Sequence, residues 1–140
     1  MATLCKRGSV KEVGTVLLKD TGRKNKVFCT QDIRPDRVRH ELYLTKWLLN
    51  QEADYVVRYA DVDASLRPDA ELHFEDGLLF VELDTGSESH EQVRQRMAVY
   101  QNCTDPVVWV CLTEKRLDGI KDVCPYSHHL FSLWNVSKFL

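Results

Sequence analysis

The chain has 140 residues, of which 44% are hydrophobic and 29% are charged. These proportions are close to globular averages, so they exclude a fibrous protein and a wholly disordered one. Nineteen Lys and Arg against 21 Asp and Glu give a net charge of −2. The net charge alone therefore does not indicate a polyanionic partner. If nucleic acid is bound, the basic residues must be sorted onto one face.

Membrane insertion and export are both disfavoured by the sequence. The longest apolar runs, such as residues 78–81 and 106–112, are too short to span a bilayer. Residues 1–11 contain no apolar stretch of signal-peptide length. The five cysteines are odd in number and lack a Cys-x-x-Cys pair, which favours reduced thiols. We therefore expect a cytoplasmic protein that makes no membrane contact.

Residues 1–34 are the most polar and least regular part, and we interpret them as an extension that precedes a core of residues 35–140. A β-hairpin is expected here, with strands at residues 13–18 and 26–30. The intervening turn is basic. It is either a solvated loop tip or a basic finger whose Arg23, Lys24 and Lys26 contact DNA phosphates.

The core alternates helical and strand patterns. A helix capped by Asp36 is expected to run to about residue 51, and a second, capped by Ser87 or Ser89, to about residue 102. Residues 106–112 are typical of a central strand that is parallel to a neighbour. The other expected elements are strands at 55–62, 69–75, 78–84 and 130–136 and a helix at 114–122. This order predicts an α/β fold, with one mixed central β-sheet flanked by helices on both sides.

The strands at 69–75 and 78–84 are expected to form a hairpin, because Asp76-Gly77 is typical of a two-residue type I′ turn. In that register Glu71 lies opposite Glu82, and Asp69 lies opposite Asp84. The other face of the hairpin is uniformly apolar and should pack against a helix. Opposed like charges are unfavourable, so solvent, protonation, a basic neighbour or a divalent cation must offset them.

Two segments of this hairpin resemble a nuclease core. Residues 67–70 read Arg-Pro-Asp-Ala, and residues 80–86 read Phe-Val-Glu-Leu-Asp-Thr-Gly. They resemble the PD-(D/E)XK superfamily, which has a restriction-endonuclease-like fold. With the following helix, which contains Gln92, Arg96 and Tyr100, they most resemble the replication-relaxation family of plasmids and other mobile elements. Residues 39–42 (Arg-His-Glu-Leu) add to this resemblance, which covers roughly residues 35–112.

The resemblance implies a Mg²⁺ or Mn²⁺ site on the hairpin. Asp69 and Glu82 would bind the ion through their carboxylates, and Leu83 through its backbone carbonyl. Glu41 matches an extra acidic residue of many members, although a surface Glu favoured by the helix dipole is the alternative. Arg67 and Arg94 are expected to contact DNA phosphates.

Asp84 is the chief departure, because the usual nuclease has Lys there to orient water and offset negative charge. Two accounts are open. The cation has moved to the next helix, where Arg94 or Arg96 reaches the site and stabilises phosphorane charge without acting as a base. Alternatively, hydrolysis is lost and the fold survives as a binding domain.

The sequence thus favours a metal-dependent DNA endonuclease of a mobile element, with Asp69, Glu82, Asp84 and Arg96 as catalytic residues. The alternative is an inactive nuclease-fold module that binds DNA, or proteins of plasmid replication or mobilisation. A third interpretation is a homodimer whose acidic faces meet through metal. The histidine pair at residues 128–129 is expected on the surface.

Overall fold

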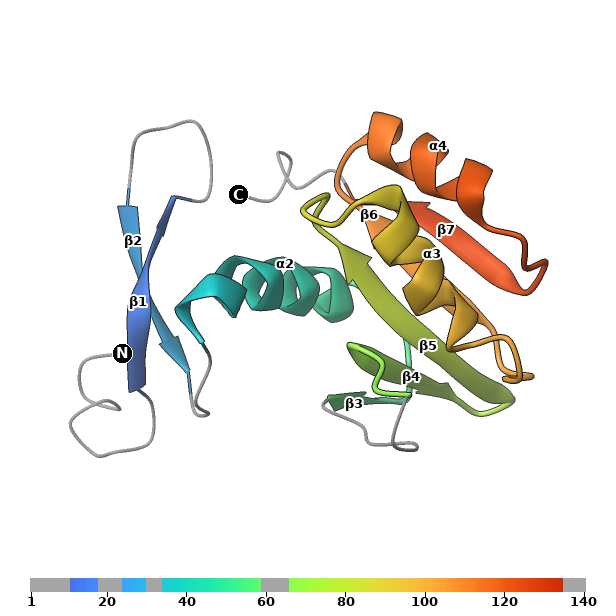
Figure 1. Cartoon of the computed structure of the whole chain (residues 1–140). Coiled ribbons are helices and arrows are strands. Elements are labelled where there is room, and N and C mark those ends of the chain that lie inside the picture. Colours follow the sequence, from blue (N-terminus) through green and yellow to red (C-terminus); the bar gives the residue numbers. More distant parts are fainter. Residues whose placement is uncertain (1–10, 18–23, 30–33, 59–65, 135–140) are drawn as a thin grey trace. The chain divides into compact units, whose positions relative to one another are not determined.

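The computed structural model describes residues 11–17, 24–29, 34–58 and 66–134. The chain divides into two compact units (Figure 1). Met1–Leu49 and Val136–Leu140 make up the N-terminal unit, and Asn50–Asn135 make up the C-terminal unit. No helix in these described ranges is both long and apolar enough to cross a membrane.

The N-terminal unit contains the expected hairpin. Strands β1 (Lys11–Leu17) and β2 (Lys24–Cys29) pair antiparallel, with Leu17 opposite Lys24 at the turn. Of the basic residues expected to contact DNA, Arg23 lies outside the described residues. Lys24 and Lys26 lie in β2, where the backbone register places Lys26 opposite Thr15.

The helix predicted after Pro35 is present in the N-terminal unit. It begins with one 3₁₀ turn, η1 (Pro35–Arg37), and continues as α2 (Val38–Leu49). Apolar residues at three- and four-residue spacing form its buried side. His40 is also buried. Its Nδ1 lies 3.3 Å from Nη2 of Arg37 and 3.5 Å from Oε1 of Glu41.

The C-terminal unit is an open five-stranded mixed sheet with the strand order β3-β4-β5-β6-β7. The first three strands are antiparallel, whereas β6 is parallel to both of its neighbours, as its apolar run predicts. The strands are β3 (Tyr55–Arg58), β4 (Ala70–Phe74), β5 (Gly77–Asp84), β6 (Val107–Cys111) and β7 (His129–Leu133).

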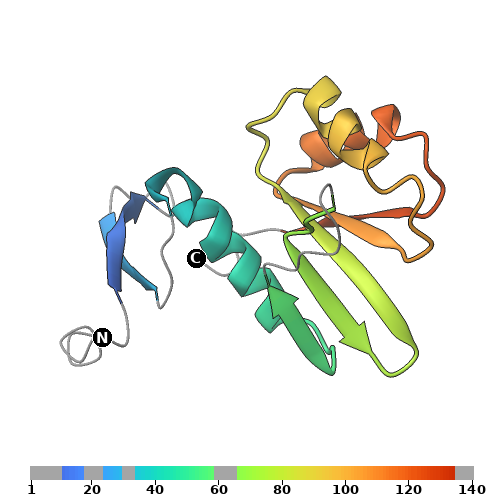
Figure 2. The same ribbon diagram turned by 60° about the horizontal axis from the view of Figure 1, so that its bottom comes forward.

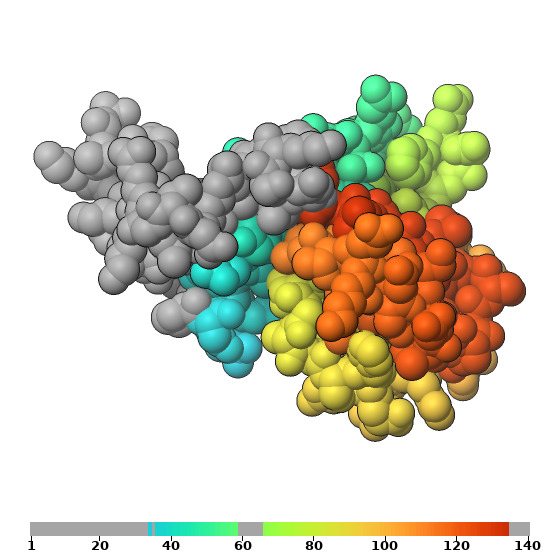
Figure 3. Space-filling view, turned by 90° about the horizontal axis from the view of Figure 1, so that it is seen from above, coloured from blue at the N-terminus to red at the C-terminus, as the bar shows by residue number. Residues whose placement is uncertain are grey.

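Helices α3 (His90–Ala98) and α4 (Glu114–Val123) pack on the same face of this sheet (Figure 2). The space-filling view shows them side by side at the surface, α3 in yellow and α4 in orange (Figure 3). Ser89 caps α3 through a capping box with Gln92, as predicted for one of the two candidate serines. The core under the helices combines Phe80, Val93, Met97, Tyr100, Val107, Trp109 and Ile120.

The predicted register of the β4–β5 hairpin is wrong by two residues. The turn is Glu75-Asp76, and Phe74 pairs with Gly77, so that Glu71 lies opposite Phe80 instead of Glu82. A shift of two residues keeps every side chain on its predicted face, so the apolar pattern cannot distinguish the two registers. The observed register avoids the directly opposed Glu71 and Glu82 carboxylates.

The expectation that the histidine pair lies on the surface is wrong for His129. This side chain is buried, and its Nδ1 accepts a 3.1 Å hydrogen bond from the Trp109 indole. Burial, together with the neighbouring His128, lowers the pKa of His129 to about 4. A neutral imidazole can therefore serve as a core residue, packed beside Trp109 and Tyr100.

Candidate functional site

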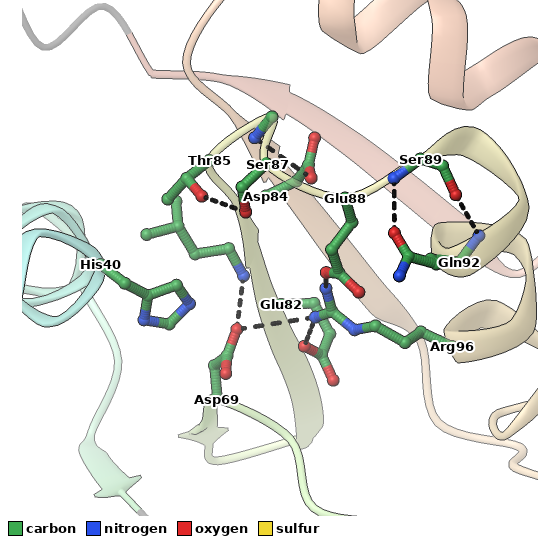
Figure 4. A network of polar contacts seen from close by, with 12 residues as sticks. His40, Asp69, Glu82, Asp84, Thr85, Ser87, Glu88, Ser89, Gln92 and Arg96 are labelled. Carbon is green, nitrogen blue, oxygen red and sulfur yellow. Dashed lines mark hydrogen bonds and ion pairs between the residues drawn. The ribbon is translucent and has the colours of Figure 1, made fainter. Parts of the chain in front are cut away.

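Four carboxylates and two guanidiniums meet at one end of the sheet face that α3 and α4 cover. Figure 4 shows the four carboxylates and the guanidinium of Arg96. We call this set the acidic centre. Asp69 directly precedes β4, whereas Glu82 and Asp84 belong to β5, and continuing the hairpin register by one residue sets Asp69 level with Glu82. The remaining members are Glu88, Arg96 and Arg116. Glu88 lies in the segment between β5 and α3, Arg96 lies on α3, and Arg116 lies on α4.

Arg96 of α3 holds three carboxylates of the acidic centre together. Its guanidinium donates to Glu82 and to Glu88, and an Nη2 lies 4.0 Å from Asp69 Oδ2. The guanidinium carbon lies 5.2 Å from the centre of the Trp109 ring, within cation–π range. Burial disfavours the charged form, but the surrounding carboxylates outweigh it and raise the pKa of Arg96.

Glu82 is the most deeply buried carboxylate that Arg96 contacts, with 5% of the residue exposed. Its second oxygen, Oε1, accepts a hydrogen bond from the Tyr100 hydroxyl. Burial and repulsion from Asp69 nevertheless outweigh the attraction of Arg96 and the Tyr100 hydrogen bond, and they raise the pKa of Glu82 to about 8. Burial and Glu82 also raise the pKa of Tyr100. Near neutral pH, Glu82 can therefore hold a proton.

Asp84 occupies the position where the nuclease pattern has Lys, and it pairs with Arg116 of α4. The guanidinium is bidentate, with Nε 2.5 Å from Oδ2 and Nη2 3.0 Å from Oδ1. The same Nη2 donates to the Glu88 carbonyl at 2.7 Å. Only 1% of the Asp84 side chain is exposed, so this ion pair compensates a charge that water does not reach.

Asp69 is held in place by two hydrogen bonds, one to its carboxylate and one to its backbone carbonyl. Its Oδ2 accepts a 2.8 Å hydrogen bond from the Leu83 N–H, and its own carbonyl accepts one of 3.1 Å from Arg58 Nε. Leu83 therefore contributes its N–H to the acidic centre. The expected metal contact of its carbonyl stays a prediction.

The structure brings together Asp69, Glu82, Asp84 and Arg96, the four residues proposed as catalytic. Of the two arginines considered as the missing cation, Arg96 reaches the centre. Arg94 is exposed and lies 4.0 Å from Glu91 on the same helix. Arg67 is also exposed.

Glu41, the fourth expected ligand, lies on α2 in the N-terminal unit, where its Oε1 contacts His40. The expectation that Glu41 joins the acidic centre stays a prediction.

Sequence reasoning missed Arg116, Glu88 and the hydroxyl of Tyr100 as members of this centre. Arg116 lies 32 residues from Asp84, and no local pattern links the two. A signal did exist in the expected parallel strand. Because the carboxyl ends of parallel strands meet at one edge, Cys111 at the end of β6 pairs with Asp84. The helix that starts three residues later, capped by Thr113, brings Arg116 to the same edge.

The acidic centre, as arranged, does not fit a divalent cation. Both oxygens of Glu82 and both of Asp84 accept hydrogen bonds from protein donors, and Asp69 Oδ2 accepts one from Leu83. The Arg96 guanidinium lies between Asp69 and Glu82, where an ion would need to bind. Within the described part of the chain, no three His, Cys, Asp or Glu residues are grouped to hold a metal.

Replacing Arg116 by Met should destabilise the protein by about 3–5 kcal/mol, because Asp84 is left buried without a counter-charge. Urea unfolding followed by circular dichroism measures the change. Lys115→Met, at an exposed position of the same helix, is the matched control and should change stability by less than about 0.5 kcal/mol. Equal stability of the two variants would contradict the structural role of the Asp84–Arg116 pair.

The raised pKa of Glu82 predicts a specific dependence of stability on pH. Between the ordinary pKa of 4.5 and the raised value of about 8, the folded protein retains a proton that the unfolded chain releases. This group therefore makes the free energy of unfolding fall as pH rises through that interval. Glu82→Gln mimics the protonated carboxyl and should remove this contribution.

Urea unfolding of wild type and Glu82→Gln at several pH values from 5 to 9 tests this expectation. The stability of wild type relative to the variant should decrease with rising pH. Glu91→Gln removes an exposed carboxylate from α3 and should follow the wild-type profile. A wild-type advantage that grows with pH would contradict the assignment.

No curated protein and no solved structure matches the chain. The model of one protein family, described as replication-relaxation, matches residues 17–108, which are about two thirds of the 140 residues. The matched range includes Asp69, Glu82, Asp84 and Arg96, and it confirms the expected resemblance to the replication-relaxation family. Membership suggests a role in plasmid replication or mobilisation. The chain thus belongs to the replication-relaxation family.

Proposed function

We propose that this protein binds DNA through its N-terminal unit and acts in plasmid replication or mobilisation without hydrolysing DNA. In this proposal the C-terminal unit is a PD-(D/E)XK-like fold whose acidic centre has become structural. Arginine takes the place that a metal ion has in an active nuclease. The proposal corresponds to the inactive binding module considered from the sequence, and it replaces the endonuclease as the favoured function.

The observation that carries the proposal is the separation of charge between the two units. The sequence of the N-terminal unit has 12 Lys and Arg against five Asp and Glu, a net charge of +7. The C-terminal unit has seven against 16, a net charge of −9. The overall charge of −2 hides this asymmetry. A unit of +7 attracts the phosphate backbone, whereas one of −9 repels it.

The paired arginines support the absence of hydrolysis. A nuclease that uses a metal ion needs carboxylate oxygens that are free to bind it. Here Arg96 and Tyr100 engage Glu82, and Arg116 engages Asp84 through both oxygens. Opening the centre for an ion would break these charge-assisted hydrogen bonds within a buried site.

A metal-dependent endonuclease is the second candidate, and one observation favours it. The acidic centre holds four carboxylates but two guanidiniums, which leaves a charge of −2 when all are ionised. Burial raises the pKa of Glu82, and repulsion from Asp69, a part of this excess, raises it further. A divalent cation would offset it, and Arg96 would then serve as the cation that the nuclease pattern expects at residue 84.

DNA binding through the N-terminal unit should show the salt dependence of phosphate contacts. For the full chain, log affinity for duplex DNA should fall linearly with log salt. Lys24→Glu with Lys26→Glu should weaken binding and lower the slope by about one for each lysine that contacts a phosphate. Fluorescence anisotropy over a salt series measures both quantities.

The matched control is Lys115→Glu with Lys121→Glu, an equal charge change at exposed positions of α4 in the C-terminal unit. This variant should bind duplex DNA like wild type. If the two double variants lose the same affinity, DNA binding does not belong to the N-terminal unit. An affinity that salt leaves unchanged would exclude phosphate contacts altogether.

Cleavage assays separate the two candidates. Wild type should not cleave single-stranded, branched or duplex DNA with Mn²⁺, and calorimetric titration with Mn²⁺ should show no saturable binding. Arg96→Ala removes the guanidinium that lies between Asp69 and Glu82, and it shows whether the carboxylates bind Mn²⁺ once this cation is absent. Cleavage by wild type that disappears in Asp69→Ala would establish the endonuclease and overturn the proposal.

A further inference from the structure

An aromatic stack lies exposed at the β3 edge of the sheet. Tyr55 and His73 face each other across strands β3 and β4, with ring centroids 4.4 Å apart and planes 9° from parallel. Tyr55 is 59% exposed. β3 is the terminal strand of the described sheet. The face of the Tyr55 ring that is turned away from His73 is therefore not covered by another strand of this sheet.

Two contacts of His73 hold the stack in position. The imidazole of His73 lies 3.0 Å from Glu71 Oε2, and the backbone carbonyl of His73 accepts a 2.8 Å hydrogen bond from the Asp54 N–H. Glu71 is buried, so its carboxylate is a fixed partner. An exposed tyrosine that is already oriented loses little conformational entropy when a flat ligand stacks on it.

The stack lies on the same face of the sheet as the acidic centre. Residues two apart on a strand share a face, which places His73, Glu71 and Asp69 in one row along β4. Four residues separate His73 from Asp69, or roughly 13 Å at the rise of a strand.

We propose that Tyr55, supported by His73, is a stacking platform for an unpaired base of single-stranded DNA. The C-terminal unit carries a net charge of −9, so attraction of phosphates cannot draw DNA to this face. Stacking on an aromatic ring accepts any base, because every base has a π-face, and it acts together with positive charge that attracts the phosphates. The +7 N-terminal unit of the same chain supplies that charge. Bases inside a duplex have no free face, and the platform therefore selects unpaired DNA. This inference rests on the proposed function, DNA binding, and adds the class of DNA.

Affinity for a short labelled oligothymidylate tests the platform in the full chain, with anisotropy as the readout. Tyr55→Ala should weaken binding by about 5- to 150-fold, the effect of losing one stacked base. Tyr55→Phe keeps the ring and should bind like wild type. An oligomer of abasic sites keeps the phosphates, and it should bind wild type and Tyr55→Ala equally.

Phe74→Ala is the matched control, because Phe74 is an exposed aromatic residue of the same hairpin on the opposite face of the sheet. It should leave binding unchanged. Equal affinity of Tyr55→Ala and wild type, or an equal loss in Phe74→Ala, would overturn the platform while duplex binding still supports the proposed function. If wild type binds neither single-stranded nor duplex DNA, the proposed function fails and the platform fails with it.

Discussion

The folded C-terminal unit depends on the compensation of buried carboxylates by arginines from its two helices. Glu82 and Asp84 are almost inaccessible to water, and an uncompensated charge at such depth is among the most destabilising features a protein can have. Arg96 and Tyr100 join Glu82 to α3 and the residues that follow it, and Arg116 joins Asp84 to α4. The same contacts that neutralise the carboxylates therefore fix where both helices lie on the sheet.

Much of this architecture can be predicted from local patterns, because alternation along a strand and capping of a helix are short-range properties. The faces of β4 and β5 follow from alternation alone, and Ser89 caps α3 as one of two candidates. The register is different, since it depends on where the turn closes. Asp76-Gly77 is a strong turn signal, yet closing the turn at Glu75-Asp76 lets Gly77 join β5. The predicted register opposes two pairs of carboxylates, whereas the observed one opposes only Asp69 and Glu82.

The partners of the acidic centre could be predicted only where they lie close in sequence. Arg96 follows Glu82 by 14 residues on the next helix, and the sequence offers it, with Arg94, as a cation that reaches the site. Arg116 follows Asp84 by 32 residues and becomes a partner only because β6 is parallel to β5. The burial of His129 is unpredictable for the same reason, since it depends on packing with Trp109 from a neighbouring strand. Sequence patterns record the periodicity of single elements, whereas these contacts depend on how several elements assemble.

The charge asymmetry between the units restricts how the whole chain can engage DNA. Contacts of a +7 unit with phosphates release counterions and weaken steeply with salt. A −9 unit that touches DNA must do so through groups whose attraction does not depend on charge, and an exposed aromatic ring meets that condition. The two modes also favour different DNA, because phosphates are present on every strand but free base faces occur only where strands are unpaired. A protein that combines them would remain on duplex DNA at low salt and gain its selectivity for unpaired DNA as salt rises.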